Sequence, residues 1–159
     1  MSANYPNLST LIPPLALYQG QPANPTAPSS TSSYQMQGLG QAATIQPNFS
    51  GKVRITISGN FIAADTTIND GILLQVSYGT GNAPAVNGAL AGTQIGAITE
   101  YTNPAAVTAN DVHIPFSVEA VVTGLAVGTV YWADLAAKAV TTASDIGLSN
   151  LNVIIQEIL

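Results

Sequence analysis

Apolar and polar residues alternate with a period of two along much of the chain after about Tyr34. Val53, Ile55 and Ile57 alternate with charged or hydroxyl-bearing side chains, and longer alternations of the same kind run over residues 72–78 and 112–122. Successive side chains of a strand point to opposite faces, so this period predicts strands with one apolar and one polar face.

Weaker patterns fill most of the remaining sequence with further strands. They are predicted at residues 130–137 and 151–159, and with less contrast at 34–38, 42–46 and 92–99. Residues 133–140 contain good helix formers but continue a strand pattern and have no N-cap before them, so helix is expected in under about a tenth of the chain. About eight antiparallel strands predict an all-β domain over residues 34–159, a jelly-roll-like β-sandwich of two packed sheets.

Two details refine this sandwich. Pro115 lies inside the longest alternation and lacks a backbone donor, so its strand is expected at a sheet edge or with a bulge. Leu73, Val121 and Ile154 place apolar side chains on the face opposite the main apolar rows. One sheet is therefore expected to be covered on both faces, and self-association is one way to bury the second face.

The first third of the chain has a different composition. Seven of the ten prolines of the whole chain fall within its first 48 residues, which carry no charged side chain. Residues 1–33 are predicted to be an extended Pro/Ser-rich arm, because proline opposes helix and removes donors from a sheet. The arm's candidate partner-binding residues are its large apolar and aromatic side chains: Tyr5, Leu8, Leu11, Ile12, Leu15, Leu17 and Tyr18. The alternative is a tail without contacts.

Composition excludes several function classes. Only 7% of the residues are charged, three of them basic against eight acidic, and the formal net charge is −5. Such a chain cannot neutralise several phosphates, so nucleic acid is not an expected partner. The absence of cysteine excludes disulfides and thiol catalysis, and no metal or cofactor is expected. The longest early apolar stretch is too short to span a membrane, and the basic residues that start a signal peptide do not precede it, so we expect neither a membrane partner nor secretion.

The sequence offers little for catalysis. His113 is the only imidazole and falls on the polar face of its strand, which favours an exposed histidine over a catalytic base. The eight carboxylates are scattered, and Asn69-Asp70-Gly71 is typical of a turn more than of a calcium site. Glu119 and Asp134 are expected to face solvent or to pair with Lys52, Arg54 or Lys138. No enzymatic activity is predicted; polysaccharide hydrolysis is the weakest hypothesis considered.

Three segments carry a resemblance to a known family. Residues 51–59 (GKVRITISG), 76–84 (VSYGTGNAP) and 122–132 (VTGLAVGTVYW) resemble a recurrent β-sandwich module of tailed-bacteriophage structural proteins, over about residues 38–159. The last segment is also similar to the turn before the core tyrosine of fibronectin type III domains, although those have an early tryptophan and this chain has a late one. The phage resemblance implies a trimeric virion component, either a capsid decoration (cement) protein or a head or tail fibre tip, without catalytic residues.

The leading hypothesis is therefore a capsid decoration protein, made in the host cytoplasm and located in the virion. It would form a homotrimer on the major capsid protein or another virion protein, with the arm reaching neighbouring subunits and gaining affinity by effective concentration. The alternative is a receptor- or glycan-binding fibre tip, in which loops such as 82–93 and 99–111 carry recognition.

Overall fold

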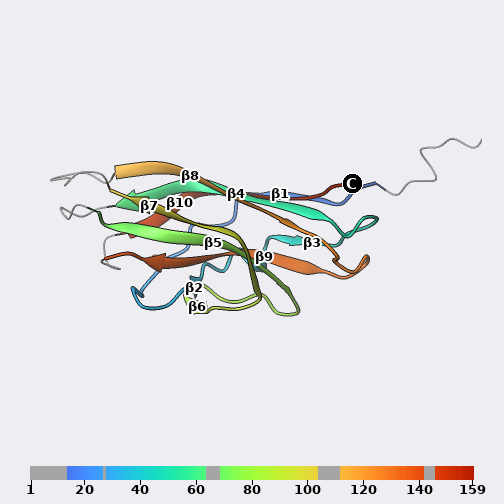
Figure 1. The fold of residues 1–159 in the computed structure, drawn as a ribbon, viewed down its shortest axis with the longest axis horizontal. Helices are drawn as coiled ribbons and strands as arrows, with labels where there is room; N and C mark the ends of the chain where they lie inside the picture. Colours follow the sequence, from blue (N-terminus) through green and yellow to red (C-terminus); the bar gives the residue numbers. More distant parts are fainter. Residues whose placement is uncertain (1–13, 27, 64–68, 104–111, 142–145) are drawn as a thin grey trace, which may run out of the picture.

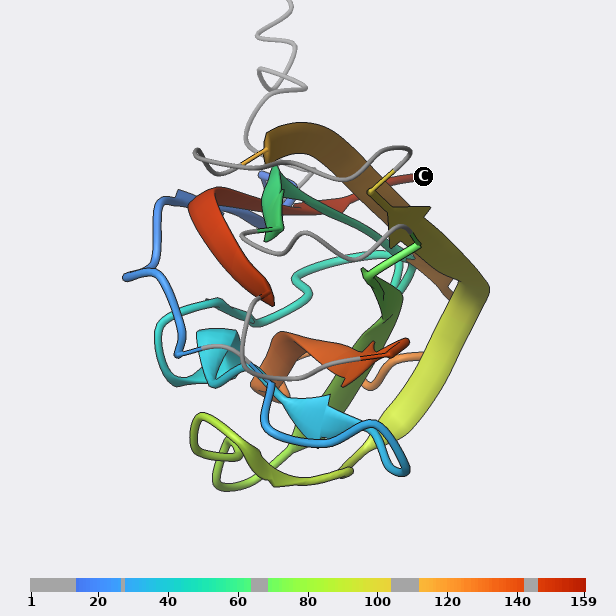
Figure 2. The same ribbon diagram turned by 90° about the vertical axis from the view of Figure 1, so that its left-hand side faces the viewer.

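The computed structural model describes residues 14–26, 28–63, 69–103, 112–141 and 146–159, and within them the fold is an all-β, jelly-roll-like sandwich. Its two antiparallel sheets pack face to face, as the side and end views show (Figure 1, Figure 2). The strands are β1 (Leu17–Gly20), β2 (Gln35–Met36), β3 (Thr44–Ile45), β4 (Val53–Ala63), β5 (Gly71–Thr80), β6 (Gly88–Ala89), β7 (Thr93–Thr102), β8 (Val112–Val122), β9 (Tyr131–Ala139) and β10 (Ile146–Glu157). The helical element among the described residues is a single 3-10 turn, η2 (Leu39–Gln41).

Sheet A contains four strands in the order β1-β10-β4-β8. Sheet B contains six: β6-β2-β9-β5-β7 in order, with β3 also paired to β9. The two sheets approach each other where β7 lies beside β8 (Figure 2). There the Tyr101 hydroxyl donates to the Ser117 carbonyl and accepts from the Ser117 N–H, each at 3.3 Å, which fixes the two edge strands together.

The core lies between the sheets and is filled by the apolar rows that the alternation predicts. Ile55 and Ile57 of β4 belong to one cluster of buried side chains with Leu74 and Val76 of β5, and Phe61 of the same cluster is fully buried. Burying a side chain of this size stabilises the fold by about 1.5–3 kcal/mol. The alternation of β8 is realised residue by residue, with Phe116, Val118, Ala120 and Val122 buried and the residues between them exposed.

Sheet B is covered on both faces, but not at the residues on which the expectation rested. Val121 and Ile154 belong to sheet A, where Val121 is 40% exposed, and Leu73 of β5 is only partly buried. A second buried cluster of Met36, Trp132 and Ala136 lies on its outer face, under Tyr34, Ala83 and Ala91. The covering segments belong to the chain itself, so this face needs no second copy to bury it. Self-association remains a proposal.

Most predicted strands are confirmed, including the weak ones now seen as β2, β3 and β7. Among the described residues there are ten strands where about eight were expected; the two additional ones are β1, at the edge of sheet A, and the two-residue β6, at the edge of sheet B. Pro115 lies in β8, at the edge of sheet A, where a missing N–H donor leaves no ladder bond unmade.

The proline-rich segment differs from its prediction. Leu17–Gly20 forms β1, an antiparallel edge strand on β10, so the expectation that residues 1–33 contribute no donors to a sheet is wrong for this part. Four residues between Pro14 and Pro22 suffice for such a strand, because an edge strand uses only one row of its hydrogen-bonding groups. Pro28 is buried, and the Ser30 carbonyl accepts the Ala139 N–H at 3.0 Å. The described residues before 34 thus pack on the sandwich.

Candidate functional site

The most strongly organised polar feature is the point where the N-terminal segment joins the sandwich. Glu157, near the end of β10, is fully buried. Its Oε2 accepts the backbone N–H groups of Ala16 (3.0 Å) and Asn48 (2.9 Å). Its Oε1 accepts those of Phe49 (2.8 Å), Ser50 (2.7 Å) and Gly51 (3.3 Å), and also the Ser50 hydroxyl (3.3 Å).

The backbone of residues 48–51 folds into this shape for identifiable reasons. Gly51 has φ +63°, a conformation that favours glycine, and this lets successive N–H groups converge on one carboxylate. Burial alone would raise the pKa of Glu157, but the backbone donors outweigh it and lower the pKa to about 2. The carboxylate is therefore ionised at neutral pH and binds these backbone groups as a charged acceptor.

Further hydrogen bonds connect the N-terminal segment to the same region. The Glu157 N–H donates to the Ala16 carbonyl at 2.8 Å, while the Asn48 side-chain amide donates to the Pro14 carbonyl at 3.0 Å. Residues 14–16 are thus fixed to the sandwich immediately before β1. We call this set of contacts, made by Pro14, Ala16, residues 48–51 and Glu157, the arm anchor.

The predicted partner-binding residues fall into three groups. Tyr5, Leu8, Leu11 and Ile12 lie outside the described residues. Leu15 and Leu17 are 37% and 63% exposed, so they are available to a partner. Tyr18 is partly buried and packs against the core of its own domain, because in a strand it must point to the face opposite Leu17; its role in partner binding stays a prediction.

Two of the predicted charged positions have different outcomes. Glu119 is exposed and lies 3.5 Å from Arg54, as expected for a surface pair. Asp134 is fully buried, and the expectation that it faces solvent or a basic residue is wrong. Its carboxylate accepts the N–H groups of Gly38 (3.1 Å) and Leu39 (3.0 Å), at the start of η2, and of Leu135 (2.7 Å), its neighbour in β9. Burial raises the pKa of Asp134 to about 6, although these donors oppose the shift.

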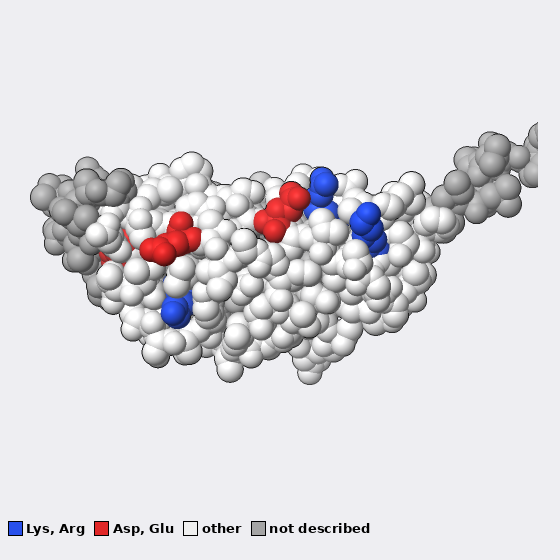
Figure 3. All heavy atoms as spheres, viewed as in Figure 1, with Lys and Arg blue, Asp and Glu red and all other residues white. Residues whose placement is uncertain are grey.

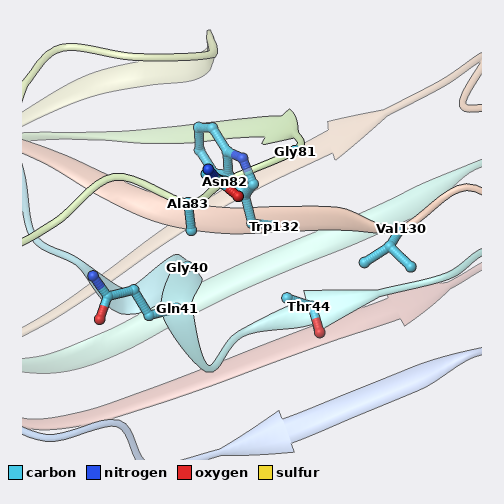
Figure 4. Close-up of a pocket in the computed structure, with 8 residues that line it drawn as sticks. All are labelled: Gly40, Gln41, Thr44, Gly81, Asn82, Ala83, Val130 and Trp132. Atoms are coloured by element: carbon cyan, nitrogen blue, oxygen red, sulfur yellow. The ribbon is translucent and has the colours of Figure 1, made fainter.

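A polar hollow of about 410 Å³ lies on the outer face of sheet B. Figure 4 shows its walls: Gly40, Gln41 and Thr44 on one side, and Gly81, Asn82 and Ala83 on the other. Trp132 lies between them, and Val130 closes one end. All of these residues are uncharged. Asn82 begins a loop that the sequence named as a candidate for recognition, whereas residues 104–111 of the other such loop lie outside the described residues.

The described residues present little that resembles a catalytic centre. They contain no group of three or more His, Asp or Glu side chains placed to hold a metal ion. His113 is exposed on β8, and no hydrogen bond joins it to another described side chain. Nor does any helix of the described part reach the length and apolarity needed to cross a membrane. Charged side chains are few and scattered over the face seen in Figure 3.

Comparisons with known proteins do not assign a family. No family model and no curated protein matches the chain. Among solved structures it is similar to part of dimeric latent PorU from Porphyromonas gingivalis, at 14% identity and a TM-score of 0.42, over 91% of this chain and 13% of that one. It is also similar to Eiger TNF from S. frugiperda, at 14% identity and a TM-score of 0.33, over 91% of this chain and 86% of that one. Similarity this distant says nothing about function.

Proposed function

We propose that this chain is a non-catalytic structural protein of a bacteriophage particle: a capsid decoration protein that forms trimers on the head and attaches through its N-terminal segment. The observation that carries this proposal is the arm anchor. Burying a charged carboxylate has a large desolvation cost, which its six donors offset, and the result is a firm attachment of the segment before β1; such an attachment suits a segment that carries the load of binding to a capsid.

The arm anchor also defines the attachment segment. Within the described residues, the contacts of the arm anchor start at Pro14, and we propose that residues 1–13 are the part that binds a partner. This segment holds Tyr5, Leu8, Leu11 and Ile12 and no charged side chain. Exposed Leu15 and Leu17 continue its apolar character onto the edge of sheet A. An uncharged apolar segment of this kind suits an apolar groove on a capsid subunit.

The test is attachment to capsids purified from a phage strain that lacks this protein. The chain 14–159 retains the arm anchor and should stay folded, but it should fail to attach at concentrations where the full chain saturates the capsid. Leu8→Ser/Leu11→Ser in the full-length chain should fail in the same way, which excludes an effect of length. Ile98→Ser is the matched control, and attachment should persist in this variant. Ile98 is 54% exposed on β7, the edge strand of sheet B that lies beside β8, and β8 is at the opposite edge of sheet A from β1. Full attachment of 14–159 would refute the arm's role.

The oligomer is tested separately by sedimentation equilibrium of the full chain. A trimer should sediment at three times the chain mass of 16.2 kDa. A monomer at every concentration would refute the trimer.

The second candidate function is the receptor- or glycan-binding tip of a phage fibre. The polar hollow beside Trp132 is the observation that favours it, because it is uncharged and borders the loop that begins at Asn82. Labelling of the chain in virions by electron microscopy separates the two: signal over the whole head supports decoration, and signal only at a fibre end supports the tip.

A further inference from the structure

We propose that the polar hollow on the outer face of sheet B is a binding site for a neutral saccharide. The site is independent of the arm anchor, and it stands or falls separately from capsid attachment. Its volume of about 410 Å³ lies within the range of roughly 300–1,000 Å³ that small-molecule sites occupy. One or two sugar rings fit such a space.

The hollow exists because small residues line it. Gly81 has φ +76°, and a Cβ built there would meet no atom within 4 Å, so it would project into open space. A Cβ at Gly40 would lie 3.2 Å from the Cβ atoms of both Ala83 and Trp132, which shows how closely the 3-10 turn approaches the floor. Larger side chains at these positions would fill the hollow or lift its wall.

The floor is held rigid. The Trp132 indole N–H donates to the Thr80 carbonyl at 3.3 Å. A Cβ on Gly79 or Gly92 would collide with the indole ring, so the backbone of both glycines packs closely against it. Trp132 is only 4% exposed, and it therefore serves as a fixed floor and not as a stacking platform. A floor that does not move on binding reduces the entropy lost by the site.

The rim supplies hydrogen-bonding groups of both kinds. Gln41, Thr44 and Asn82 are exposed, and their amides and hydroxyl both donate and accept. Within the described part of the chain, the side chains of Thr44 and Asn82 have no hydrogen-bond partner, and the Gln41 amide makes one long bond to the Pro84 carbonyl at 3.5 Å. These groups remain available to a ligand (Figure 4).

The residues that line the hollow are uncharged and can form hydrogen bonds, and this determines which class of ligand fits. No lining residue carries a charge, so a phosphate, a sulfate or an ionised sugar would lose hydration without gaining a counter-charge. A purely apolar ligand would leave the rim amides unsatisfied. A neutral saccharide matches both features, because its hydroxyls pair with the amides while its C–H groups face Val130 and the indole edge.

The experiment is an NMR titration of the full, isotope-labelled chain. The probes are defined neutral saccharides: glucose, galactose, mannose and N-acetylglucosamine, with their di- and tetrasaccharides, each to about 10 mM, ten times a weak dissociation constant of about 1 mM. The side-chain amide signals of Gln41 and Asn82 and the indole N–H signal of Trp132 should shift and saturate with at least one probe. No shift with any probe overturns the proposal.

Two variants test the assignment. Gln41→Ala and Asn82→Ala change exposed side chains, and each should weaken binding about fivefold, as the loss of one hydrogen bond implies. Gln21→Ala and Asn24→Ala are the controls; they line a second hollow, beside Asn150, and should bind as the unmodified chain does. Equal weakening by both sets overturns the site, and so does equally strong binding of an uncharged Gly-Ser-Asn-Thr peptide. A chain that attaches to capsids but binds no saccharide refutes only this inference.

Discussion

The side-chain carboxylate of Glu157 accepts the backbone N–H of Ala16 at 3.0 Å, across 141 positions of sequence. This contact joins the last strand to the residue that precedes the first one. The same carboxylate also gathers the N–H groups of residues 48–51, so one side chain ties three distant segments together.

Glu157→Gln should therefore be one of the most destabilising single changes of a polar residue in the chain. An amide NH2 would replace one acceptor oxygen and face N–H donors, leaving several of them without an acceptor. Hydrogen bonds to a charged group contribute about 1.5–3 kcal/mol each, so a loss of about 3 kcal/mol or more in the free energy of unfolding is expected. Urea unfolding monitored by circular dichroism measures it.

The control is Glu119→Gln, which removes the exposed pair with Arg54 and should cost less than about 1 kcal/mol. Similar unfolding free energies for the two variants would contradict the role of the arm anchor.

Truncation should separate the arm from the fold. If residues 1–13 serve a partner, as proposed, their removal should leave the unfolding free energy unchanged, because the chain 14–159 keeps every residue of the arm anchor. Removal of residues 1–20 should cost about 2–4 kcal/mol, since it takes away β1, the packing of Tyr18 and one donor to Glu157. Equal stability of the two truncated chains would show that β1 contributes nothing to the sandwich.

Stability should depend on pH through two carboxyl groups whose pKa values shift in opposite directions on folding. The pKa of Asp134 rises from 3.8 to about 6 on folding, so its protonated form is favoured in the folded state. Its contribution is full below pH 3.8 and is lost as the pH rises through 6, an effect on the order of 3 kcal/mol. The pKa of Glu157 falls from 4.5 to about 2, so its contribution is present above pH 4.5 and is lost as the pH falls through 2.

Asp134→Asn tests the first of these effects, because an amide does not titrate. Between pH 4 and 7 the unfolding free energy of the unmodified chain should decline relative to that of the variant. Parallel pH profiles over this range would mean that Asp134 titrates in the folded chain as it does when unfolded.

Alanine substitutions at two glycines distinguish the cost of a strained backbone from the cost of a steric collision. Gly124 has φ +76° with no atom within 4 Å of a built Cβ, so Gly124→Ala should cost only the strain of a left-handed backbone, about 1–2 kcal/mol. Gly51 has a similar φ of +63°, but a Cβ there would run into the Leu125 carbonyl oxygen. Gly51→Ala should therefore cost clearly more, and its residues 48–51 should no longer converge on Glu157. Equal costs in thermal unfolding would refute the collision.

The sequence predicts the strands well where burial alone decides them. In β8, Phe116 and Val118 alternate with exposed neighbours, and the period of two carries that information. The sequence does not predict β1, because Pro14 and Pro22 oppose a strand there, and only the tertiary pairing with β10 shows that four residues between them suffice.

The buried acids mark the limit of sequence reasoning. Asp134 lies among apolar residues on both faces of β9, and its residue type alone cannot tell a solvent-facing position from one capped by the backbone of Gly38 and Leu39. Glu157 resembles an exposed residue at the end of the last strand. The one available signal was the turn-forming segment Asn48-Phe49-Ser50-Gly51, whose N–H groups needed an acceptor.

Electron cryo-microscopy of the intact phage particle tests the central claim most directly. The account predicts three copies of the sandwich around each attachment point on the head, with density for residues 1–13 leaving the Glu157 end of sheet A and lying in a groove of a capsid subunit. A head surface that lacks the sandwich, or a sandwich seated on the head with residues 1–13 touching no other subunit, would contradict it.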